Sequence, residues 1–272
     1  MVYQLNFHQS LAPETEALAQ LLRVASEQPG YLTKEEISGI TMIPTGNRSG
    51  KVVPHILYAE AMGLLHVKKK DIKFSLSLTK VGQVVYEEDP YLIEGITKWL
   101  CHYGLVHKTS PAILWSYVFN YFIPRIGLQF HQSTLENAAT RNFEVTKINF
   151  SPFRSYFLAE RCFEIGIMNI NGDEYKLTPH NIDRKYRHFY GYMLLKHWEN
   201  ELGNQSEITY NQVVEEIGFG NPFLWDEGVV MEVLELLQDE GVLVINRQLS
   251  PITIIKQVSA DYSLNKLYNF II

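Results

Sequence analysis

The chain has 272 residues, enough for two or three domains of ordinary size. Hydrophobic residues make up 46% and charged residues 20%, which excludes a disordered chain and indicates a packed core. No apolar run approaches the roughly 18–20 uncharged residues of a membrane span, and Met1–Gln20 lacks the pattern of a secretory signal. Cys101 and Cys162 lie far apart in apolar sequence. We therefore expect buried free thiols and a cytoplasmic protein.

Charge is distributed unevenly along the chain. The net charge of −6, taken alone, argues against a nucleic-acid ligand. From Gly46 to Lys80, however, there are seven basic residues and two acidic ones, which gives a net charge of +5. From Glu207 to Glu240 there are nine acidic residues and no lysine or arginine. The first segment is suited to attract phosphates, and the second would repel them.

The first 88 residues have the pattern of a winged helix-turn-helix domain. The apolar spacing of Leu18, Leu21 and Leu22 predicts an amphipathic helix that ends near Pro29. Thr33 is a candidate N-cap for a short second helix, and Val52–Met62 predicts a third. Two strands with a lysine-rich tip between them follow. This order of helices and hairpin is that of a DNA-binding winged helix.

A middle region follows, over residues 89–205. Apolar and aromatic residues predict helices at Ile96–Leu105, Ala112–Phe122 and Tyr186–Leu202. Asn171-Gly172-Asp173 predicts a tight hairpin turn. We expect a helical middle domain here.

Residues 206–272 resemble the first domain in outline and are acidic. Turns and apolar segments predict helices at Asn211–Ile217 and Gly228–Leu237, then strands at Val242–Ile245 and Ile252–Ile255. The expected fold class is therefore mainly α with small β-hairpin wings (α+β). The expected domains are an N-terminal winged helix-turn-helix at 1–88, the helical region at 89–205 and a C-terminal winged-helix-like interaction unit at 206–272.

The turn before the third helix is the first candidate DNA contact. Two glycines there permit a close backbone approach, and the helix N-terminus favours phosphate. Gly46 and Gly50-Lys51 do not have Walker A spacing, which excludes nucleotide hydrolysis at this turn. The candidate contacts of the turn and its helix are Asn47, Arg48, Ser49, Lys51, His55 and Tyr58. The alternative is a solvated turn of a protein-interaction domain.

Two other basic clusters are candidate DNA contacts. Lys68, Lys69 and Lys70 form the tip of the predicted hairpin, where they either reach phosphates or are simply solvated. Arg184, Lys185 and Arg187 alternate with aromatic residues, a pattern that suits a backbone contact with base stacking. The alternative for this second cluster is an ordinary helix N-terminus whose charges face water.

Catalytic patterns are weak. The chain has no His-Glu-x-x-His, Cys-x-x-Cys or Gly-x-Ser-x-Gly motif. A metal-dependent nuclease needs two or three convergent carboxylates, and no spacing unites the candidates here. Those candidates are Asp89, Glu94, Glu160, Glu164, Asp173, Glu174 and Asp183. The residues alone therefore assign neither a catalytic group nor a cofactor.

Several motifs resemble a known family. Thr45–Leu64, Asp89–Leu92, Thr97–Tyr103 and Trp115–Phe122 are similar to the uncharacterised-domain family number four-thousand-seven, which is found in bacterial DNA phosphorothioation clusters. The resemblance implies a role in antiphage defence, as the DNA-nicking B component of an Ssp system. Such a component works beside a cysteine desulfurase, an ATPase and an ATP pyrophosphatase. A divalent metal is implied only if the chain nicks DNA.

Three functional hypotheses follow from these observations. The first is a DNA-binding nickase subunit of a sulfur-modification complex. The second is a non-catalytic DNA-binding adaptor or winged-helix transcription regulator that bridges DNA and partner enzymes. The third is a pure protein-interaction scaffold. The net charge of +5 over Gly46–Lys80 favours the first two, and the acidic segment predicts a protein contact at the other end of the chain.

Overall fold

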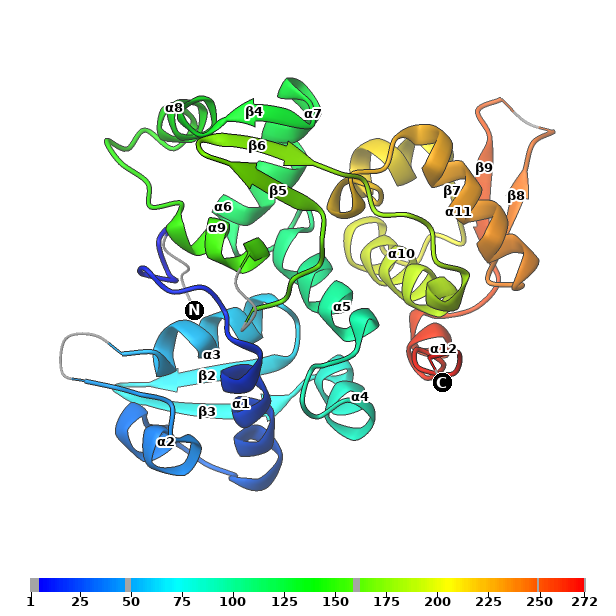
Figure 1. Ribbon diagram of the computed structural model, residues 1–272. Coiled ribbons are helices and arrows are strands. Elements are labelled where there is room, and N and C mark those ends of the chain that lie inside the picture. The colour runs from blue at the N-terminus through cyan, green and yellow to red at the C-terminus, as the bar shows by residue number, and fades with distance from the viewer. Residues whose placement is uncertain (1–4, 47–49, 159–161, 249, 272) are drawn as a thin grey trace. The chain divides into compact units, whose positions relative to one another are not determined.

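The computed structural model describes residues 5–46, 50–158, 162–248 and 250–271 (Figure 1). The chain divides into two compact units, residues 1–178 and 179–272. The structure is α+β, with many helices and small antiparallel sheets, which confirms the expected class at that level. Among the described residues, no helix combines the length and apolarity needed to cross a bilayer.

The N-terminal unit begins with helices around a small sheet. The strands form an antiparallel sheet in the order β1-β3-β2. Two further helices follow the sheet. The elements are α1 (Thr15–Glu27), β1 (Leu32–Thr33), α2 (Lys34–Thr41), α3 (Val52–Ala61), β2 (Leu65–Lys70), β3 (Lys73–Leu78), α4 (Lys80–Glu88) and α5 (Gly95–Val106).

Local sequence explains these elements. Thr33 caps α2 by accepting the Glu36 amide N–H, and the Glu36 carboxylate accepts the Thr33 N–H, a complete capping box. The apolar stripe of α1 is buried as its spacing predicts, with Leu18, Leu21 and Leu22 fully enclosed. The first helix and the N-cap of the second were thus correctly predicted.

The second half of this unit holds a sheet of which only the hairpin was expected. Its strands lie in the order β4-β6-β5, so residues 89–178 are not purely helical. The hairpin turn at Asn171–Asp173 is confirmed, with Asn171 paired to Glu174. The elements are α6 (Ile113–Tyr117), the π-helical turn η1 (Val118–Phe122), α7 (Ile123–Ile126), β4 (Gln129–His131), α8 (Gln132–Asn142), α9 (Ser151–Leu158), β5 (Met168–Asn171) and β6 (Glu174–Leu177).

The C-terminal unit contains the third sheet, in the order β7-β9-β8. Its long helix α10 (Arg187–Leu202), expected in the middle region, packs here against α11 and α12. The predicted strands are confirmed to within one residue. The other elements are η2 (Arg184–Tyr186), β7 (Glu207–Thr209), η3 (Gln212–Ile217), η4 (Asn221–Phe223), α11 (Glu227–Asp239), β8 (Leu243–Asn246), β9 (Thr253–Lys256) and α12 (Ala260–Leu264).

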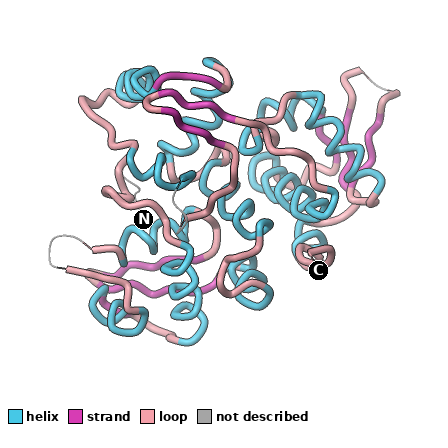
Figure 2. The backbone as a smooth tube through the Cα atoms, in the orientation of Figure 1, coloured by secondary structure: helices cyan, strands magenta, loops and turns pink. Residues whose placement is uncertain are grey.

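One order of elements therefore occurs three times along the chain. Each copy has a helix, a short strand, two helices and a hairpin, and in each sheet the third strand lies between the first and the second. Figure 2 shows the three small sheets separately, in magenta. The copies run from α1 to β3, from α6 to β6 and from α10 to β9, and we refer to them as the first, second and third repeats.

The same glycine joint precedes the hairpin in each repeat. Gly63, Gly166 and Gly241 all have positive φ angles, which glycine adopts without steric cost. Two buried apolar residues follow each glycine and start the hairpin. The carbonyl oxygen of the first of these two residues accepts a hydrogen bond from a backbone N–H just after the hairpin. The donor and acceptor are Thr79 and Leu64 in the first repeat, Thr178 and Ile167 in the second, and Gln257 and Val242 in the third. The joint thus closes each hairpin onto its helices.

Two other glycines allow helices to pack on the first of these joints. A Cβ added to Gly82 in α4 would lie 2.0 Å from the carbonyl oxygen of Leu64. A Cβ added to Gly104 in α5 would lie 2.4 Å from that of Met62. These contacts are with backbone, so rotation of a side chain cannot relieve them.

We expect Gly104→Ala to lower the free energy of unfolding by about 3 kcal/mol, the upper end of the usual cost of overpacking. Guanidinium denaturation of the full chain measures this. Gly39→Ala is the matched control, because nothing lies within 4 Å of a Cβ at that helical position. The control should raise stability by about 0.5–1 kcal/mol. Equal effects of the two changes would contradict the close packing of α5.

Candidate nucleic-acid interface

The turn before α3 is only partly available as an interface. Asn47, Arg48 and Ser49 lie outside the described residues, so they stay predictions. The ammonium group of Lys51 forms an ion pair with Glu14, with Nζ 2.8 and 3.0 Å from the two carboxylate oxygens. Lys51 is half-buried in this pair. Its charge is therefore compensated within the unit.

His55, expected to face DNA, is fully buried instead. Its Nε2 accepts the backbone N–H of Glu14 at 3.1 Å, so Nδ1 carries the proton and donates to the carbonyl oxygen of Lys51 at 2.6 Å. Burial lowers the pKa of His55, which favours this neutral form. Nε2 thus joins α3 to the start of α1, while Nδ1 bonds within the first turn of α3.

Tyr58 was also expected at the interface and is fully buried too. Its hydroxyl donates to the carbonyl oxygen of Leu11 at 3.0 Å. Its ring makes edge contacts with Phe7 and Trp115, at centroid distances of 5.0 and 6.1 Å, and stacks on His8. The segment before α1 and the helix α6 therefore cover α3 on this side.

The third helix as a whole is enclosed. Only Val53 and Glu60 are half-exposed, and every other residue of α3 is buried. A helix that reads base edges must present side chains to the major groove. In this conformation α3 presents only Val53 and Glu60, so the buried His55 and Tyr58 are not accessible to a groove.

The hairpin β2–β3, in contrast, presents a basic surface. Lys68, Lys69 and Lys70 are exposed, as expected, but they lie in strand β2, and the tip itself is the turn at Asp71 and Ile72. The strand register pairs Lys70 with Lys73 and Lys68 with Ser75, so Lys68, Lys70 and Lys73 share one face. We call this set the lysine face. The sequence analysis did not select Lys73, although its alternation with Phe74 and Leu76 was the available signal.

Few acidic groups oppose the lysine face. Glu36 at the N-terminus of α2 is close enough to Lys73 for an electrostatic attraction. Among the described residues, no ion pair involves Lys68, Lys69 or Lys70, and Lys69 lies over the ring of Phe74 at 5.8 Å. The lysine face is therefore the part of the predicted DNA contacts that is both basic and accessible.

The cluster near residue 184 is split between surface and interior. Arg184 and Lys185 are exposed. Arg187 forms an ion pair with Glu240 at 3.0 Å and lies over the ring of Phe270 at 3.4 Å. It also donates from Nη1 to the carbonyl oxygen of Arg184 at 2.8 Å. Arg187 thus joins the start of α10 to Glu240 and Phe270, and the expected cluster of three free cations is not formed.

Potential metal ligands do not gather in the described part of the chain. No three His, Cys, Asp or Glu side chains there could hold one ion. Asp89 is buried, and its two oxygens accept the amide N–H groups of Ile93 and Glu94 before α5. Cys101 and Cys162 are buried free thiols, as expected, and burial raises the pKa of Cys101.

The cover of α3 should weaken at acid pH. Burial lowers the pKa of His8 to about 4, whereas histidine in an unfolded chain titrates near 6.5. Between these two values the unfolded state binds a proton that the folded state does not. The free energy of unfolding therefore falls as the pH decreases below about 6.5.

Between about pH 7 and about pH 5 the free energy of unfolding of the parent should fall by about 2 kcal/mol more than that of His8→Gln, which has no imidazole to titrate. Guanidinium denaturation at the two pH values measures this for the parent and the variant. A variant with the same pH dependence as the parent would contradict the buried, neutral state of His8.

Comparison with known proteins identifies the fold. A family model described as "Protein of unknown function (DUF4007)" matches residues 53–152. A crystal structure of SspB aligns with a TM-score of 0.75 and 16% sequence identity, covering 97% of this chain and 86% of that one. A magnesium-ion-bound crystal structure of SspB aligns with a TM-score of 0.73 and 14% identity, with the same coverage.

A search of curated proteins gave no match. The family model spans the end of the first repeat and most of the second. The expected resemblance is therefore confirmed: residues 53–152 resemble the DUF4007 family, and the chain shares the fold of SspB.

Proposed function

We propose that the chain is a DNA-binding component of a bacterial DNA phosphorothioation system and acts in the cytoplasm. The observation that carries this proposal is the lysine face of the β2–β3 hairpin. Its cations are exposed on a rigid sheet and have few acidic neighbours. The shared fold with SspB and the match to DUF4007 support the link to phosphorothioation.

We further propose that each repeat is a winged helix. The order of helices and strands and the position of the third strand agree with that architecture in all three copies. In the first repeat the wing, β2–β3, would bind the phosphate backbone, because α3 is enclosed. Phosphate contacts fix the position of a protein on DNA without reading its sequence.

The third repeat is suited to a protein partner instead. The exposed side of its third helix carries Glu227, Glu232 and Asp239, which would repel phosphates, and Glu235, which forms an ion pair with Arg247. We propose that this surface binds a basic region of the cysteine desulfurase, ATPase or ATP pyrophosphatase that the family resemblance implies. Co-purification of the full chain with these enzymes tests this contact, and its absence would contradict it.

DNA nicking is a second candidate function. One observation favours it, which is that a structure with this fold holds a magnesium ion. In the described part of this chain, acidic and histidine side chains do not gather into a ligand set for such an ion. We therefore assign no residue to a metal or to a nucleophile.

We expect Lys68→Ala, Lys70→Ala and Lys73→Ala together to weaken binding of duplex DNA. Log affinity falls as log salt rises, and each lost phosphate contact should make this slope less steep by about 0.9. Fluorescence anisotropy with a labelled duplex over a salt series measures both quantities. The three changes should leave stability nearly unchanged, because all three side chains are exposed.

The matched control replaces three exposed lysines from other elements, Lys147, Lys176 and Lys196, with alanine. This control removes the same charge from the chain, so it separates a local contact from a general effect of net charge. An unchanged salt slope in the hairpin variant, or an equal loss in the control, would contradict DNA binding by the lysine face.

Conversion of supercoiled plasmid to the open-circular form decides between a nickase and an adaptor. If the chain nicks DNA, the purified protein should produce open circles with Mg²⁺ or Mn²⁺, and chelation with EDTA should stop a metal-dependent reaction. Plasmid that is bound but stays supercoiled under every condition would contradict the nickase and leave the adaptor.

A further inference from the structure

The second repeat contains a groove lined by tyrosines. It consists of two adjoining hollows of about 350 and 280 Å³ that share Tyr117, Tyr121 and Asn142. One wall comes from α6, η1 and α7, and the other comes from the end of α8. We call it the tyrosine groove. Its larger hollow lies in the volume range of small-ligand sites.

Aromatic rings form the surface of the tyrosine groove. Tyr117 and Tyr121 stack with their centroids 6.4 Å apart and their planes 15° apart. Phe143 contacts the ring of Tyr117 by its edge at 5.2 Å. Tyr121 is 41% exposed, so part of its ring stays accessible to a ligand beside Tyr117 and Arg125.

Cations surround these rings. Arg125 lies over the ring of Tyr121 at 5.7 Å and donates from Nη1 to the carbonyl oxygen of Tyr121 at 2.7 Å. Arg141 lines the opposite wall and is exposed. No aspartate or glutamate lines either hollow. From Lys98 to Arg154 the sequence has six basic residues and two acidic ones, so the surroundings are positive as well.

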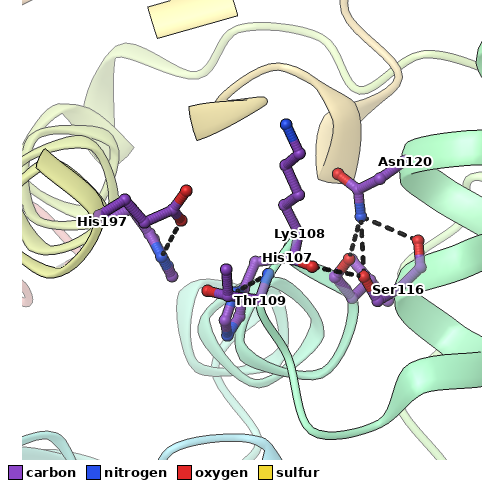
Figure 3. A network of polar contacts seen from close by, with 8 residues as sticks. His107, Lys108, Thr109, Ser116, Asn120 and His197 are labelled. Carbon is purple, nitrogen blue, oxygen red and sulfur yellow. Dashed lines mark hydrogen bonds and ion pairs between the residues drawn. The ribbon is translucent and has the colours of Figure 1, made fainter. Parts of the chain in front are cut away.

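A polar network joins the helical segment that carries the tyrosines to the end of α5 and the loop after it. Asn120 donates from Nδ2 to the carbonyl oxygens of Val106 at 2.8 Å and Ser116 at 2.9 Å. The hydroxyl of Ser116 donates to the carbonyl oxygen of Lys108 at 2.9 Å (Figure 3). The network spans the change from α6 to the π-helical turn η1, a distortion that is frequent at functional sites. The backbone segment that carries the stacked rings is thus anchored by hydrogen bonds on both sides of this change.

We propose that the tyrosine groove binds single-stranded DNA, with one base stacked on Tyr121 and the flanking phosphates held by Arg125 and Arg141. Stacking platforms beside cations are the usual means of binding a single strand without sequence preference. A paired base in a duplex is already stacked on both faces and cannot enter. This inference rests on the proposed DNA-binding function and adds a site for an unpaired strand.

Anisotropy of a labelled oligothymidylate on the full chain tests the site. Tyr121→Ala should weaken binding about tenfold, whereas Tyr121→Phe should bind as the parent does because the ring is retained. Tyr91→Ala is the matched control, since Tyr91 is 70% exposed and lines neither hollow. Equal affinity of Tyr121→Ala and the parent would overturn the proposal.

Tryptophan fluorescence provides a second readout, from a residue inside the groove. The four tryptophans of the chain, Trp99, Trp115, Trp198 and Trp225, are all buried. Tyr121→Trp therefore adds an exposed indole whose emission should be quenched when a base stacks on it. An oligomer of abasic sites with the same length should bind more weakly and quench less. Equal quenching by the abasic oligomer, or by an acidic peptide, would overturn base stacking.

The two proposals fail in different ways. If the lysine face binds duplex DNA and the tyrosine groove does not bind a single strand, the hairpin variant loses duplex affinity while Tyr121→Ala has no effect on any DNA. If the parent chain binds neither a duplex nor a single strand, the proposed function itself is wrong.

Discussion

The candidate nucleic-acid interface of this protein depends on the burial of polar groups in α3. A buried histidine or tyrosine is destabilising unless its polar atoms are hydrogen-bonded. Here His55 Nε2 and the Tyr58 hydroxyl find backbone partners at Glu14 and Leu11, at the start of α1 and in the segment before it. That segment therefore packs over α3 and encloses it. The surface left for a ligand in the first repeat is the hairpin, whose lysines have no comparable partners in the interior.

Local sequence was sufficient to predict several elements, because their causes are local. The capping box at Thr33, the turn at Asn171–Asp173 and the strands of the third repeat depend on neighbouring residues. The third strand of the middle sheet, β4, was missed because it has only three residues, Gln129–His131, with one buried side chain. The joint at Gly166 repeats those at Gly63 and Gly241, and it was the signal that could have revealed the second repeat.

The candidate site was less predictable for a different reason. Its accessibility depends on contacts between residues far apart in the sequence. Neither the bond from Tyr58 to Leu11 nor the pair of Lys51 with Glu14 has a local signature. Charge could be counted from the sequence, and the exposed Lys68, Lys69 and Lys70 agree with that count. The fold was needed to show which cations form internal ion pairs, as Arg187 does with Glu240.

The three repeats share one backbone plan and differ in surface charge, and this difference has a consequence for how the chain would approach DNA. Residues 179–272 contain 13 acidic and seven basic residues, so they carry the whole net charge of −6, while residues 1–178 are neutral overall. A polyanion would therefore repel the C-terminal unit, whereas the N-terminal unit has no net charge and carries the lysine face. Salt screens this repulsion beyond a Debye length of about 8 Å at physiological ionic strength.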